Sequence, residues 1–217
     1  MLSQIVSLVK KDFTTEFKSQ ERIAGVILYL FSTILVLYYS LVKVERFLWV
    51  SIFWILLIFL SINALNSSFS KEIRTRHWYY YSLVHPLAVY FSKLIFNFIW
   101  LFVLTTLSIL IFKVFFDVPP LRFGLFAVTL ISSTLGIACI FTFISLISGK
   151  SSDQSTVMSV LATPLIFPIM MAGSRLMMNA FGLLSDTDYS ADFLSIIAID
   201  IVAIGLSILL FPILWRD

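Results

Sequence analysis

The sequence predicts an all-α integral membrane protein with six transmembrane helices, preceded by an N-terminal amphipathic helix. Only 12% of its 217 residues are charged, whereas a soluble domain has about 25%. The mean hydropathy is +1.02, so the chain has too few polar groups to cover its surface in water. The apolar runs are continuous rather than alternating, which favours helices over the strands of a membrane barrel.

A helix needs about 20 apolar residues to cross a bilayer. Six segments have this length, and short connectors join them into a single membrane domain over residues 1–217. The segments are Ile23–Val42, Leu48–Phe69, Leu87–Phe116, Phe123–Ile147, Thr156–Met178 and Phe193–Trp215. The third segment is long. We therefore expect Tyr90 and Lys93, near its start, to lie at the membrane interface with the lysine snorkelling towards water.

Residues 1–22 precede the first span and are predicted to form an amphipathic helix in the cytoplasmic interface. Apolar residues recur there at helical spacing, and polar residues fill the other side. The apolar set is Leu2, Ile5, Val6, Val9, Phe13 and Phe17, and the polar set is Lys10, Lys11, Asp12, Thr14, Thr15 and Lys18.

The distribution of basic residues predicts the orientation of the chain. Leaving out the interfacial Lys93, nine basic residues fall on one side of this topology and five on the other. The nine are Lys10, Lys11, Lys18, Arg22, Lys71, Arg74, Arg76, Lys150 and Arg216, and the five are Lys43, Arg46, Lys113, Arg122 and Arg175. Basic residues favour the cytoplasmic side, so both termini are predicted to be cytoplasmic.

One stretch between the second and third spans, KEIRTRHWYYYSLVHP, contains both histidines and four consecutive aromatic residues. As a short helix over about residues 71–82 it would pair Glu72 with Arg76 at i, i+4, and Pro86 would end it. Its residue types suit either a docking surface for a partner or an aromatic belt without one. The candidate interface residues are Lys71, Glu72, Ile73, Arg74, Arg76, His77, Trp78, Tyr79, Tyr80 and Tyr81.

Other chemistry finds little support in the sequence, and we predict no catalytic, cofactor-binding or metal-binding residue. His77 and His85 have no nearby cysteine to complete a zinc site, and the single Cys139 is expected to be a small buried residue. The GKSS sequence at Gly149–Ser152 lacks the first glycine of a phosphate-binding loop, because position 144 is Ile. The chain is therefore predicted to have no nucleotide site of its own.

Polar residues inside spans are candidates for function. Arg175 lies near one end of the fifth span, and Asp200 lies seven residues into the sixth, roughly 10 Å along it. We predict an Arg175–Asp200 intramembrane pair; the alternative is that both side chains snorkel. Asn63, Asn66 and Asn97 are expected to form hydrogen bonds between the second and third spans.

Taken together, these features resemble the permease subunits of type-2 ABC exporters, and in detail the CcmB family, the haem exporter protein B of cytochrome c maturation. The most specific stretch is YYYSLVHP followed by YFSKLIFN. The stretches LVKKDFTTEFKSQERIAGVILY and LLFPILWRD extend the resemblance along essentially the whole chain.

This resemblance implies a non-enzymatic multi-pass subunit of the bacterial inner membrane, with ATP bound by a partner and haem as the possible cargo. The implied partners are a CcmA-like ATPase, a CcmC-like haem-handling membrane subunit, a CcmD-like one-span subunit and a CcmE-like periplasmic haem chaperone, with two permease copies. The alternatives are a permease for another substrate, such as a lipid or drug, a membrane haem enzyme, or a structural scaffold.

Overall fold

The computed structural model describes residues 1–41, 43–65, 86–148, 154–184 and 189–216. Within these ranges the chain forms seven helices and no strand. The helices are α1 (Leu2–Lys18), α2 (Gln20–Ser40), α3 (Arg46–Leu65), α6 (Pro86–Phe116), α7 (Phe123–Ser148), α8 (Gln154–Ala180) and α9 (Ser190–Arg216).

Six of these helices are long and apolar enough to cross a bilayer, which confirms the predicted fold class. The segments that meet this criterion are Ile23–Ser40, Arg46–Leu65, Pro86–Phe116, Phe123–Ser145, Thr156–Ala180 and Ser190–Leu209. They agree with the predicted spans to within a few residues, except where the described residues limit the comparison: the predicted Leu48–Phe69 continues past Leu65, where the described part of α3 stops, and α9 itself runs to Arg216.

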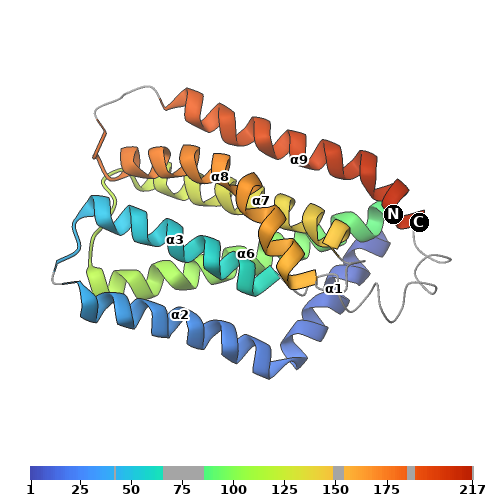
Figure 1. Ribbon diagram of the computed structural model, residues 1–217, viewed down its shortest axis with the longest axis horizontal. Coiled ribbons are helices and arrows are strands. Elements are labelled where there is room, and N and C mark those ends of the chain that lie inside the picture. The colour runs from blue at the N-terminus through green and yellow to red at the C-terminus, as the bar shows by residue number, and fades with distance from the viewer. Residues whose placement is uncertain (42, 66–85, 149–153, 185–188, 217) are drawn as a thin grey trace.

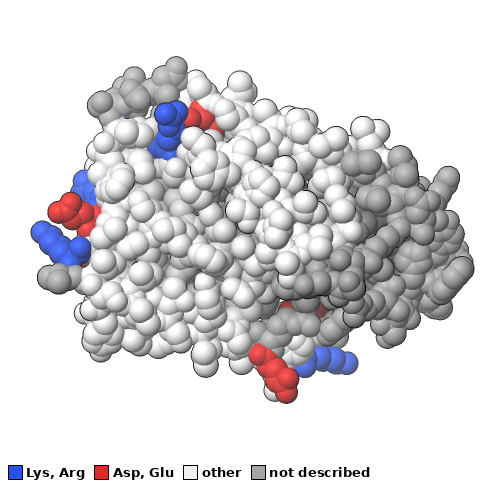
Figure 2. Space-filling model, in the orientation of Figure 1, with Lys and Arg blue, Asp and Glu red and all other residues white. Residues whose placement is uncertain are grey.

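The six long helices run along the length of the molecule, whereas α1 lies at an angle to α2 (Figure 1). Both termini lie at one end of the bundle, here called the terminal end; the opposite end is called the distal end. On the face shown in Figure 2, charged side chains lie at the distal end and at one place on the lower edge, with a broad uncharged surface between them. A bundle whose long sides face lipid should show this distribution.

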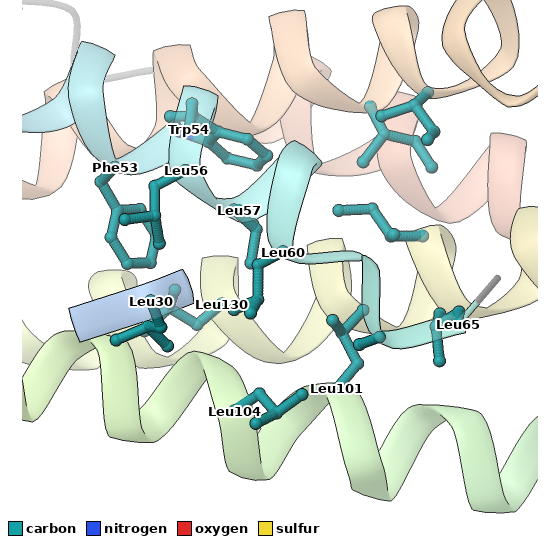
Figure 3. Close-up of a cluster of buried hydrophobic side chains, with 14 of the residues drawn as sticks. Leu30, Phe53, Trp54, Leu56, Leu57, Leu60, Leu65, Leu101, Leu104 and Leu130 are labelled. Atoms are coloured by element: carbon teal, nitrogen blue, oxygen red, sulfur yellow. The ribbon is translucent and has the colours of Figure 1, made fainter. Parts of the chain in front are cut away.

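The core of the bundle lies around α3 and α7. Within their apolar windows 61% and 67% of residues are buried, against 17% for both α2 and α9. In Figure 3, leucines of α3 point towards Leu101 and Leu104 of α6 and Leu130 of α7. The buried residues of α2 are Val26, Leu30 and Ile34, a narrow stripe at i, i+4 and i+8, with the partly buried Ile23 and Leu37 beside them. α2 and α9 are therefore peripheral helices, most of whose surface is free to face lipid or another subunit.

The distal end is tied together by its connectors. The backbone N–H groups of Leu121 and Arg122 both donate to the carbonyl of Ala180, at 3.0 and 2.9 Å. The Trp49 ring packs against Phe181 with ring centroids 4.8 Å apart. The hydrogen bonds fasten the α6–α7 connector to the end of α8, and the ring contact fastens the start of α3 to the residue that follows α8.

Candidate functional site

The ten candidate interface residues between positions 71 and 81, which we expect to be the surface for coupling to an ATPase, lie outside the described residues, as do His85 and the GKSS sequence at 149–152. The described chain stops at Leu65 in α3 and resumes at Pro86 in α6. A partner that binds the segment between them would therefore act on the ends of a core helix and of the longest helix. The structure does describe the start of α6, at the terminal end of the bundle, where α1 packs against it.

The N-terminal helix α1 packs along the first half of α6. Its buried residues are Leu8, Asp12 and Glu16, spaced at i, i+4 and i+8 so that they share one face. Leu8 belongs to a small apolar cluster with residues of α6 and α7: Val89, Tyr90, Leu94 and Cys139. α1 is therefore docked on the bundle by a face that carries two acidic side chains.

An ion pair lies at the centre of this docked face. Lys93 Nζ of α6 is 3.0 Å from Asp12 Oδ2, and both side chains are only 6% exposed. Lys11 Nζ approaches the other carboxylate oxygen at 3.2 Å, but its side chain is 31% exposed. Asp12 therefore has a buried partner on α6 and a second, partly solvated partner on its own helix.

Two aromatic contacts follow the ion pair along the same two helices. Phe13 packs edge-on against Phe96, with ring centroids 5.0 Å apart. One turn further, Phe17 packs edge-on against Trp100 at 6.4 Å. Edge-to-face pairs at these separations are favourable, so they strengthen the docking of α1 beyond the ion pair.

The expectation that Lys93 snorkels is wrong, because the lysine is buried against Asp12 rather than directed to water. The assignment of Asp12 to the solvent side of α1 fails for the same reason. Part of the apolar stripe is exposed instead: Leu2 and Val6 by 80% and 66%, and Phe17 by 63% although its ring touches Trp100. Two features of the sequence could have indicated the ion pair. Leu8, Asp12 and Glu16 share one face of a helix, and Lys93 lies eight positions into an apolar helix.

The structure pairs Arg175 with Asp192, not with Asp200 as predicted. Arg175 Nη1 lies 3.7 Å from Asp192 Oδ1, and the arginine side chain is 68% exposed. Asp192 is in the first turn of α9, at the same end as Arg175. Asp200 lies eight residues further along, about 12 Å deeper. The exposed arginine therefore meets the nearer carboxylate, where both groups can also reach water.

Asp200 instead packs against α7 and is only 6% exposed. A methyl group built on Gly136 would collide with Asp200 Oδ1 and with Ile169 Cδ1 of α8. The absence of a side chain at Gly136 therefore makes room for the aspartate between α7, α8 and α9. Among the described residues no cation lies within ion-pair distance of Asp200.

The predicted asparagine hydrogen bonds fall on different helices. Asn97 Nδ2 donates to Thr142 Oγ1 at 2.9 Å, and both residues are buried, so this bond joins α6 to α7. Asn63 donates to the carbonyl of Phe59 in its own helix. Asn66 lies outside the described residues. The bond from Asn97 to Thr142 therefore fixes α6 against the core helix α7.

The described residues offer no evident cofactor site. No group of three or more His, Cys, Asp or Glu among them could hold a metal ion. Cys139 is buried, as predicted. A cavity of about 250 Å³ at the distal end has walls from Trp49, Lys113 and Phe126 among others. It is smaller than the roughly 300–1,000 Å³ typical of ligand pockets, and we assign no ligand to it.

Comparison with known proteins gives one match. The family model described as CcmB protein matches residues 3–213. No curated protein and no solved structure matches the chain. The matched range begins within α1 and ends within α9, so it contains all six apolar helices and the docked N-terminal helix.

Proposed function

Because the chain belongs to the CcmB family, we propose that it couples ATP hydrolysis by a separate subunit to haem export or to release of a haem-loaded periplasmic chaperone. Family membership makes it a multi-pass component of the bacterial inner membrane and part of the ABC system for haem export in cytochrome c maturation. The direction of coupling, the cargo step and the identity of the partners are our proposal.

The observation that carries this proposal is the extent of the family match. It covers residues 3–213 and so includes residues 71–81 as well as the spans. A permease that binds no nucleotide itself needs a surface on which the ATPase can act. Residues 71–81 lie between α3 and α6, and they include the Trp and Tyr residues that often dominate binding energy.

The proposed mechanism is differential contact. An ATPase can shift a permease between two arrangements only if it binds those arrangements with different affinities. We propose that its nucleotide states contact residues 71–81 differently and so displace the adjoining ends of α3 and α6. α3 lies in the core, so a displacement there would be transmitted to its neighbours.

We assign the remaining partners on the same basis. The system is proposed to contain a CcmA-like ATPase, CcmC-like and CcmD-like membrane subunits, a CcmE-like chaperone and two permease copies. In this scheme ATP is bound by the ATPase and haem is handled as cargo. The exposed apolar surfaces of α2 and α9 offer area for contacts with such membrane subunits.

We expect Trp78→Ala and Tyr80→Ala each to reduce co-purification of the ATPase, by about tenfold if the side chain is a hot spot. Maturation of c-type cytochromes should fall in parallel. The matched control is Tyr39→Ala, which removes an 80% exposed ring from the last turns of α2. Wild-type co-purification and maturation in both test variants would argue against residues 71–81 as the coupling surface.

A further inference from the structure

We infer that Asp12 and Lys93 are positioning residues that make α1 and the first turns of α6 move as one body. This inference rests on the proposed function, because it concerns how motion at the start of α6 reaches the rest of the permease. Lys93 follows Pro86 by seven residues, about 10 Å along the helix. The ion pair therefore lies within the part of α6 that a displaced Pro86 would move first.

The contacts between α1 and α6 are in a single register. Asp12 meets Lys93, Phe13 meets Phe96, and Phe17 meets Trp100. The partners advance together along both sequences, so the two helices run in the same direction over this contact. Sliding one helix by a turn would separate all three pairs at once.

The ion pair makes this register specific. Apolar side chains can exchange neighbours with little change in energy, whereas a buried carboxylate has few acceptable partners. If α1 separated from α6, the ion pair between Asp12 and Lys93, both now 6% exposed, would be broken. Lys11 could compensate Asp12 only in part, because it lies at the solvated edge. Movement of α1 with α6 is therefore favoured over movement past it.

This attachment extends to α2. α1 ends at Lys18 and α2 begins at Gln20, so Ser19 alone separates them. α2 packs on the bundle through the narrow stripe of Val26, Leu30 and Ile34, and its Phe31 and Tyr38 rings contact Phe115 near the end of α6. A smaller share of its apolar window is buried than in α3, 17% against 61%. Motion at the start of α6 should thus reach the start of α2 through the ion pair and α1, whereas the other end of α2 packs directly on the last turns of α6.

The first test exchanges the two charges. Full-length variants are expressed with the ATPase partner in a bacterium that lacks its own family member, and holocytochrome c is measured. Asp12→Lys and Lys93→Asp singly should each lower holocytochrome c about tenfold or more, because each places two like charges together in a buried site. The double exchange should restore at least half of the wild-type amount. Full activity of both single variants, or no recovery in the double variant, would overturn the pairing.

A second test does not depend on those variants folding. Phe13→Cys and Phe96→Cys are combined in a Cys139→Ala background and joined by a short bifunctional thiol reagent, leaving Asp12 and Lys93 intact. If the two helices move as one body, the cross-linked protein should retain the maturation activity of the same variant before treatment. Loss of activity on cross-linking would show that α1 and α6 must separate, and would overturn the inference.

Failure of the proposed function would look different. A wild-type permease that supports maturation equally well with a catalytically inactive ATPase would contradict ATP coupling, whatever the cross-link does. Dependence on an active ATPase, combined with loss of activity on cross-linking, would leave the proposed function standing and remove only the one-body inference.

Discussion

Replacing Lys93 by Met is expected to destabilise the folded protein by about 3 kcal/mol, because Asp12 would stay buried without its main partner. We place the value at the lower end of the range for broken buried pairs because Lys11 still approaches the carboxylate. The measurement is the free energy of unfolding in bilayer nanodiscs. This substitution isolates the energetic role of the ion pair from its role in positioning.

The matched control is Lys113→Met, the same substitution at an exposed site in the last turn of the same helix. It should change stability by no more than about 0.5 kcal/mol. Combining Asp12→Leu with Lys93→Met removes both charges together and should recover most of the loss, since apolar replacements of buried pairs are often neutral. Equal stability of the Lys93 and Lys113 variants would mean that the ion pair contributes nothing to folding.

The second large effect is expected at Gly173 of α8. A Cβ there would collide with the Trp54 ring of α3 and come within 2.8 Å of Ser133 Oγ of α7. Gly173→Ala should therefore destabilise the bundle by about 1–3 kcal/mol through overpacking, and Gly173→Val by more. Three helices meet at this point, so the added methyl group cannot be accommodated unless the Trp54 ring moves.

Gly205 provides the control, because nothing lies within 4 Å of a Cβ built on it in α9. Gly205→Ala should leave stability unchanged or raise it by up to about 1 kcal/mol, since alanine is the better helix former. The two substitutions thus have opposite expected signs, which thermal unfolding in nanodiscs can resolve. Destabilisation of the same size at both sites would indicate that the close approach of α8 to α3 is not as described.

The membrane fold was predictable because each span is a continuous apolar run of the required length. Phe123–Ile147 was expected, for example, and α7 covers Phe123–Ser148. Such runs identify a helix without any knowledge of its neighbours, since the solvent alone selects it. The same property explains the small boundary differences, because the run does not determine where hydrogen bonding stops.

Side-chain partners were not predictable from the same signal. Asp200 and Arg175 were paired because they are the charged residues of adjacent spans, but the first turn of α9 places Asp192 nearer to the arginine. Lys93 was assigned to the interface on its own, since hydropathy gives no sign that α1 folds back onto α6. Asn97 likewise bonds to Thr142, 45 residues away. How deep a side chain lies and which helix it faces depend on how the helices pack together. Hydropathy along the sequence does not give this packing.

We propose that this permease couples ATP hydrolysis by a partner ATPase to cytochrome c maturation. The most direct measurement is holocytochrome c in a strain that lacks its own family member and produces this chain with either an active or a catalytically inactive ATPase subunit. We expect maturation only with the active ATPase, while the inactive ATPase still co-purifies with the permease. Equal maturation with both ATPase forms, or none with either form despite normal assembly, would contradict it.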